Sequence, residues 1–110
     1  RLVGWGRAME LSLLAERLPA ETAHEWGLVN RLFEDNDELL EGAMGIARRL
    51  ADGPRSLALI RQAYWNTWHN AFEQQIDLEA RLQNEAGSSS DFSEGVSAFL
   101  EKRDAKFTGA

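Results

Sequence analysis

Apolar residues recur at three- and four-residue intervals along most of this chain, the period at which an α-helix presents one face. The first such stretch runs from Arg7 to Leu18 and should end at Pro19, and a second, shorter one runs from Pro19 to Gly27. Branched and aromatic residues at 28–33 favour one short strand. The first part of the chain is therefore predicted to hold two helices and a strand.

A longer helix is predicted to follow, introduced by the capping side chains at 35–37 and ended before Pro54. Gly42 and Gly45 lie inside it, which indicates either that another element packs closely there or that the helix is weak. A further helix begins after Pro54 and should break near 69–70.

The last two helices are predicted at 72–87 and 91–103. Asp91 and Glu94 have the spacing of a capping box for the second of them. The serines at 88–90 have no base nearby and are typical of a turn rather than of a nucleophile. The predicted fold class is mainly α, with at most one short strand.

Charge and composition exclude several classes of function. Eighteen acidic and twelve basic residues give a net charge of −6, which disfavours nucleic acid as a partner. Without cysteine the chain holds neither a disulfide nor a thiolate metal site. No apolar run approaches the ~20 residues that span a bilayer, and no secretory signal is present. We expect no membrane role and a cytoplasmic protein.

Residues that carry chemistry are scarce. His24 and His69 are the only histidines, and neither has a metal-ligand spacing to another donor, so surface or capping roles are expected. Paired carboxylates fall at helix starts or on polar faces, where the helix dipole and solvation explain them. The sequence predicts no catalytic residue and no metal site. The chain also begins without methionine, as a piece of a longer protein would.

The end of the chain offers the one lead toward a ligand. Three cations and two aromatic rings gather within nine residues of an otherwise acidic sequence: Phe99, Lys102, Arg103, Lys106 and Phe107. Basic residues at a helix C-terminus complement its dipole, and they also bind anions. On these grounds alone both interpretations stay open.

Several segments resemble the C-terminal portion of the enoyl-CoA hydratase/isomerase (crotonase) family. They occur in the same order and at the same spacings as in that family: 1–4, 7–11, 18–23, 26–30 and 94–103. The most specific resemble A-x-E-A-x-x-x-G-L-V-N and E-G-x-x-A-F-L-E-K-R-x-x-x-F. Residues 25–28 and 74–79 look most like the branch of 2-(1,2-epoxy-1,2-dihydrophenyl)acetyl-CoA isomerases in phenylacetate degradation.

The resemblance implies a parent enzyme whose missing N-terminal portion is a spiral of ββα turns that carries the oxyanion hole and the proton-moving acids. Residues 1–34 would end that spiral, and 35–110 would form a helical region for trimerisation and for covering CoA. Phe99 and Lys102 match the positions that approach CoA in relatives, often in a neighbouring subunit's site. Because they are three residues apart, they are expected to share a helix face. Many relatives have Pro-Pro directly after the E-K-R residues of this segment, whereas this chain has Asp104-Ala105 after Arg103.

Two functional hypotheses follow. In the first, the chain is a fragment of an acyl-CoA hydratase or isomerase. It is inactive alone, needs no cofactor beyond the CoA thioester substrate, and takes part in a homo-oligomer, a trimer or a dimer of trimers. In the second, the chain is a free-standing helical module that self-associates and never meets CoA.

Overall fold

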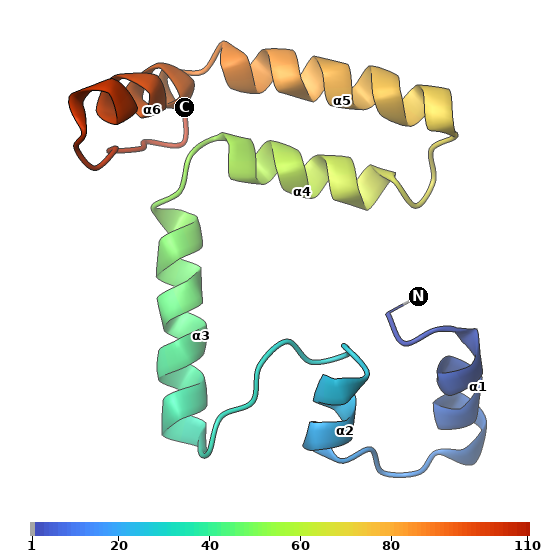
Figure 1. Ribbon diagram of the computed structural model, residues 1–110. Helices are drawn as coiled ribbons and strands as arrows, with labels where there is room; N and C mark the ends of the chain where they lie inside the picture. Colours follow the sequence, from blue (N-terminus) through green and yellow to red (C-terminus); the bar gives the residue numbers. More distant parts are fainter. Residues whose placement is uncertain (1) are drawn as a thin grey trace. The chain divides into compact units, whose positions relative to one another are not determined.

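The computed structural model describes residues 2–110, and within them it contains six α-helices and no β-strand (Figure 1). The mainly α fold class is thus confirmed. The helices are α1 Trp5–Leu14, α2 Ala20–Glu25, α3 Asn36–Ala51, α4 Ser56–Asn66, α5 Phe72–Gly87 and α6 Ser90–Glu101. The chain forms two compact units, one ending at Met44 and the other beginning at Gly45.

In the first unit, α1 ends one turn earlier than the apolar period predicted. Ala15 takes a left-handed conformation, with φ 52°, and its N–H donates to Leu11 O at 3.2 Å, which closes the helix. The residues up to Pro19 are not helical. The ring of Pro19 disfavours a helical residue before it, so the predicted extension to Leu18 was wrong.

The strand expected at 28–33 is absent because its first backbone groups are bound to α2. Gly27 has φ 74°, and the N–H groups of Leu28 and Val29 both donate to Ala23 O, at 2.9 and 3.2 Å. His24 Nδ1 donates to Val29 O at 2.9 Å, which is the capping role expected for this histidine. These hydrogen bonds occupy backbone N–H and C=O groups that a neighbouring strand would need.

The start of α3 follows the predicted signals. Asp35 Oδ1 accepts hydrogen bonds from the N–H groups of Asp37 and Glu38, at 2.9 and 2.8 Å, so it caps the helix. A side chain at Gly42 would overlap the ring of Phe33, whereas Gly45 has open space around it. Close packing therefore explains the first glycine and not the second.

In the second unit, α4 and α5 lie antiparallel, side by side (Figure 1). The predicted break near 69–70 is the turn between them. Leu59 of α4 packs with Leu78 and Leu82 of α5, and Ala63 and Ala86 flank this small core. Burying each leucine contributes about 1.5–3 kcal/mol to the stability of the pair.

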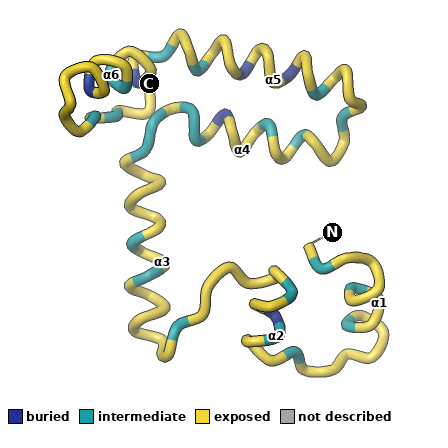
Figure 2. Tube along the Cα trace, in the orientation of Figure 1, coloured by how far each residue is buried: buried dark blue, intermediate teal, exposed yellow. Residues whose placement is uncertain are grey.

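Large apolar residues remain exposed on most helices of both units. Figure 2 shows that exposed residues predominate along the described chain. Tyr64, Phe72 and Phe99 are 75%, 76% and 81% exposed. Extended apolar surface of this kind marks places where proteins meet a partner or a ligand.

Candidate functional site

The last nine residues, 102–110, which we call the tail, turn back along α6. The C-terminus lies beside the start of this helix (Figure 1). Ala110 O accepts hydrogen bonds from Ser90 Oγ at 2.8 Å and from the N–H of Asp91 at 3.1 Å. These contacts determine the path of the tail, which the sequence had left open after Asp104-Ala105.

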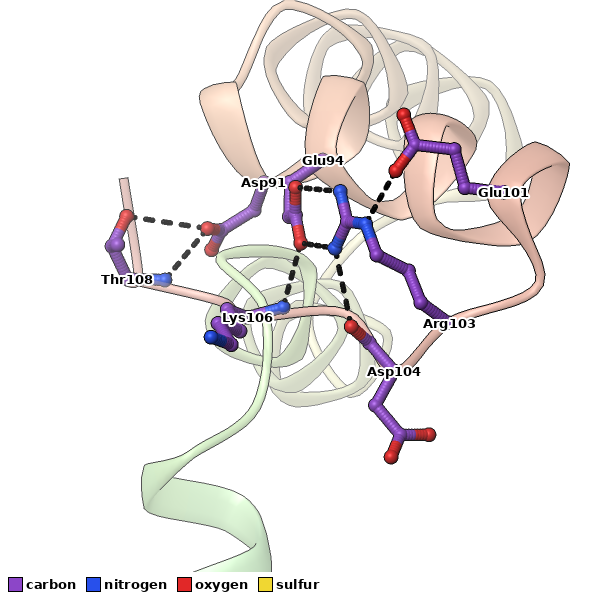
Figure 3. Close-up of polar contacts among 7 residues, drawn as sticks. All are labelled: Asp91, Glu94, Glu101, Arg103, Asp104, Lys106 and Thr108. Atoms are coloured by element: carbon purple, nitrogen blue, oxygen red, sulfur yellow. Dashed lines mark hydrogen bonds and ion pairs between the residues drawn. The ribbon is translucent and has the colours of Figure 1, made fainter.

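Asp91 is the buried charged residue that holds this arrangement, with 2% of its surface exposed. Its Oδ1 accepts from the N–H and Oγ1 of Thr108, at 2.8 and 3.3 Å (Figure 3). Its Oδ2 accepts from the N–H groups of Gly109 and Arg55, at 2.9 and 2.8 Å. One carboxylate therefore joins α6, the tail and the turn before α4.

The hydrogen bond from the Thr108 amide is the largest cause that lowers the pKa of Asp91 below its usual value. Burial acts in the opposite direction, and the amides of Arg55 and Gly109 add to the lowering. Asp91 is thus an anion at neutral pH, and four donors already occupy its oxygens. It serves structure and is not placed to move protons.

The capping box predicted from Asp91 and Glu94 was wrong. Ser89 caps α6 instead, because its Oγ accepts from the N–H of Phe92 at 3.1 Å. Asp91 lies inside the helix and faces the tail. The Asp91 carboxylate accepts hydrogen bonds from amides that are distant in the sequence, so it does not cap the helix as the local pattern had suggested.

Glu94 forms a second link between α6 and the tail. Its two oxygens accept from Arg103 Nη1 and Nη2, at 2.6 and 2.9 Å, and Oε1 also accepts from the N–H of Lys106 at 2.8 Å (Figure 3). The Arg103 hydrogen bonds, followed by that of Lys106, lower the pKa of Glu94 to about 2. The same pairing raises the pKa of Arg103.

Lys102 is the first residue after α6 and the first residue of the tail. Its φ and ψ are 55° and 42°, the left-handed conformation. The N–H of Lys102 donates to Phe99 O at 3.3 Å and that of Arg103 to Ala98 O at 3.0 Å, the hydrogen-bond pattern of a Schellman motif. Lysine occupies the position where glycine is usual.

An apolar groove of about 370 Å³ lies between α6, the tail and the residues before α4. Phe99, Phe107, Val96 and Leu100 supply most of its apolar wall. Asp91 is the ionisable residue in its lining, and its oxygens are all occupied. The groove can hold a ring or an aliphatic group, but it offers no acid or base for catalysis.

The two predicted binding residues lie in different surroundings. Phe99 lines the groove with an exposed ring, whereas Lys102 is outside the helix and is not part of the groove lining. Its positive φ turns Cβ by roughly 120° about the N–Cα bond relative to a helical residue. The two side chains therefore do not share a helix face, although their spacing of three had suggested it.

Sequence reasoning missed the roles of Asp91 and Arg103. Arg103 was counted among the three cations near the end of the chain that could bind an anion, yet it is paired with Glu94 and Glu101. The nine-residue separation of Glu94 and Arg103 gives no periodic signal, so only the reversal of the tail reveals the pair.

Within residues 2–110, no group of three histidine, aspartate or glutamate side chains lies close enough to hold a metal ion. No helix in this part of the chain has the length and apolar character required to cross a bilayer.

The chain is similar to known proteins along its whole length. Residues 1–110 match the family model described as enoyl-CoA hydratase/isomerase. The 1,2-epoxyphenylacetyl-CoA isomerase of Escherichia coli K12 is 46% identical over 99% of the chain, and a probable enoyl-CoA hydratase of Rhodobacter capsulatus is 44% identical over the same share. The chain spans 42% of the length of each of these relatives.

Solved structures agree with this match. A putative enoyl-CoA hydratase/isomerase from Mycobacterium abscessus superimposes with a TM-score of 0.93 at 32% identity. The alignment covers 99% of this chain and 42% of that protein. The helical arrangement described above is therefore one that also occurs as part of a longer chain.

Proposed function

The chain belongs to the enoyl-CoA hydratase/isomerase family, and from that premise we propose that it is the helical C-terminal part of an enzyme that acts on acyl-CoA thioesters. One observation carries the proposal: the match runs through the whole chain, yet it spans only 42% of relatives whose names specify CoA substrates. The reaction would be the hydration or isomerisation of an acyl group, with the thioester enolate held in an oxyanion hole from the rest of the protein.

The contribution of this chain would be binding and assembly rather than chemistry. The two carboxylates at the candidate site, Asp91 and Glu94, are both engaged in holding the tail, which supports the expectation that the chain is inactive alone. The exposed apolar side chains support a role in a homo-oligomer, for which the family resemblance suggests a trimer or a dimer of trimers. We place the enzyme in the cytoplasm.

Among the relatives, the Escherichia coli isomerase is 46% identical and acts, by its name, on 1,2-epoxyphenylacetyl-CoA. The same branch was indicated by residues 25–28 and 74–79. We therefore propose an isomerase of aromatic acyl-CoA as the specific activity. The test is turnover of such a thioester by the full-length protein, with 2-enoyl-CoA hydration as the competing outcome.

Phe99 and Lys102 are the residues that we propose for CoA. The exposed Phe99 ring at the groove can pack against the adenine, and the Lys102 ammonium can bind a phosphate oxygen. Because they do not share a helix face, they would contact different parts of the CoA molecule. A ring and a phosphate are separate groups on that ligand, so the arrangement remains compatible with it.

The experiment is Lys102→Ala in the full-length protein. We expect KM for the acyl-CoA to rise about two- to tenfold with little change in kcat. The reason is that the enzyme binds the CoA portion of the substrate equally tightly in the ground state and in the transition state. Lys106→Ala is the matched control, because it also removes one cation from the tail, while the hydrogen bond of Lys106 to Glu94 uses the backbone N–H and is kept. A rise in KM for Lys106→Ala with none for Lys102→Ala would show that the assignment is wrong.

A free-standing module that self-associates is the second candidate, favoured by the same exposed apolar surface. The two proposals differ in the length of the native protein. Mass spectrometry of the protein from its source would show a longer chain if the enzyme proposal is right, and a 110-residue product if the module is right.

A further inference from the structure

Lys102 adopts a conformation that its side chain disfavours. Within residues 2–110, the non-glycine residues with positive φ are Ala15 and Lys102. An L-residue in this region brings Cβ close to its own carbonyl group, which is why glycine dominates at this position of a helix end. Residues held in such conformations by their surroundings often belong to functional sites.

Arg103 makes the contacts that span Lys102. Its Nε donates to Glu101 Oε2 at 2.6 Å, and its terminal nitrogens hold Glu94 (Figure 3). Glu101 and Glu94 lie in α6, whereas Arg103 lies in the tail. The guanidinium therefore ties the chain before Lys102 to the chain after it.

The contacts of Arg103 with Glu94 and Glu101, which we call the bridge, have a geometry that can fix a conformation. Isolated surface ion pairs contribute little, but a bidentate arginine in a network of charges is the exception. The Arg103 and Glu94 side chains are 39% and 25% exposed, so both are partly shielded from water. The N–H of Lys106 adds a further hydrogen bond to Glu94.

The bridge also determines which charged side chains remain available to bind a ligand. Glu94 and Glu101 both precede Lys102 in α6, and both are already paired with Arg103. Within the described chain, the Lys102 side chain has no ion pair. Its ammonium is thus available to a ligand outside the chain.

We propose that Arg103 is a positioning residue that holds the left-handed turn at Lys102 and keeps Glu94 and Glu101 from its ammonium, so that Lys102 stays directed to an anionic ligand. This inference rests on the proposed function, under which the anion is a phosphate group of CoA. In this proposal Arg103 acts through its contacts within the chain and not by binding the ligand, since four of its five N–H groups donate to Glu94, Glu101 and Asp104 O.

The test is a double-mutant cycle in the full-length protein, read out as the Kd of coenzyme A by calorimetry. Lys102→Ala and Arg103→Gln should each weaken coenzyme A about two- to tenfold, and the double variant should be no weaker than the single ones, because both remove the same contact. The Kd of pantetheine, which lacks the nucleotide, should not change. Arg49→Gln is the matched control, since no ion pair of Arg49 occurs within residues 2–110.

The outcomes separate this inference from the proposed function. If Lys102→Ala weakens coenzyme A and Arg103→Gln does not, the inference is overturned and the CoA contact stands. If Arg103→Gln also weakens pantetheine, or if the two effects add, Arg103 has a general structural role and the inference is wrong.

If Lys102→Ala leaves the Kd unchanged, the CoA contact is wrong, and the ligand part of the inference is overturned with it. NMR then tests separately whether Arg103 holds the left-handed turn at Lys102. The Cα chemical shift of Lys102 should leave its left-handed value in Arg103→Gln and keep it in Arg49→Gln, and an unchanged shift in both variants overturns the positioning role.

Discussion

The carboxylate of Asp91 accepts hydrogen bonds from both the amide and the hydroxyl of Thr108, seventeen residues later in the chain. The same carboxylate reaches back to the amide of Arg55, thirty-six residues earlier. These bonds connect three segments through one side chain. The groove that contains Phe99 and Phe107 depends on this connection, because the tail supplies Phe107.

The first prediction concerns release of the tail by Asp91→Asn. The substitution keeps the size of the side chain but places an NH₂ group opposite backbone N–H donors, so at least one pair of donors loses its acceptor. Amide hydrogen exchange of Thr108 and Gly109 should accelerate roughly tenfold or more. Asp104→Asn is the control, since no hydrogen bond involves the Asp104 carboxylate in residues 2–110. Equal exchange in both variants would contradict the role of Asp91.

The second prediction is a dependence of the tail on pH. Glu94 has a folded-state pKa of about 2, below its ordinary value of 4.5, so its contribution to stability is complete above pH 4.5 and is lost as the pH falls toward 2. The Lys106 amide donates to this carboxylate, and its NMR chemical shift should therefore titrate with a midpoint of about 2. In Arg103→Gln the midpoint should rise toward 4.5, because the main cause of the lowering is removed. A wild-type midpoint near 4.5 would show that the contact does not form in solution.

Local signals explain which helices the sequence predicted well. Asp35 caps α3 through donors two and three residues away, a pattern that is visible in the sequence itself. Asp91 offered a similar pattern, but its actual donors are seventeen and thirty-six residues distant. Sequence periodicity contains no information about such pairs, so the capping box was assigned in error.

The expected strand and the shared face of Phe99 and Lys102 failed for a different reason. In both cases one residue with positive φ, Gly27 or Lys102, redirected the chain. Glycine signals this possibility, whereas a lysine does not. The assignment of Phe99 and Lys102 to CoA came from the family resemblance and remains a prediction.

The third prediction concerns self-association of the 110-residue chain. Five apolar residues are buried in the described part of the chain: Ala23, Leu59, Leu78, Leu82 and Ala98. Large side chains such as Tyr64, Phe72 and Phe99 are largely exposed, and association would remove them from water. Sedimentation velocity should show oligomers at high micromolar concentration. A monomer under those conditions would mean that the exposed surface does not favour association.

The last prediction compares alanine at two glycines of α3. Alanine in place of glycine inside a helix favours the helix by up to about 1 kcal/mol. Gly45 has open space, so Gly45→Ala should raise the unfolding free energy by close to that amount. At Gly42 the added methyl group would overlap the ring of Phe33, which must move and lose part of its packing, so Gly42→Ala should gain less or become destabilising. Urea unfolding followed by circular dichroism measures both, and Phe33→Ala in the background of Gly42→Ala should abolish the difference between the two sites. An equal gain at Gly42 and Gly45 with Phe33 present would show that the ring does not pack against α3.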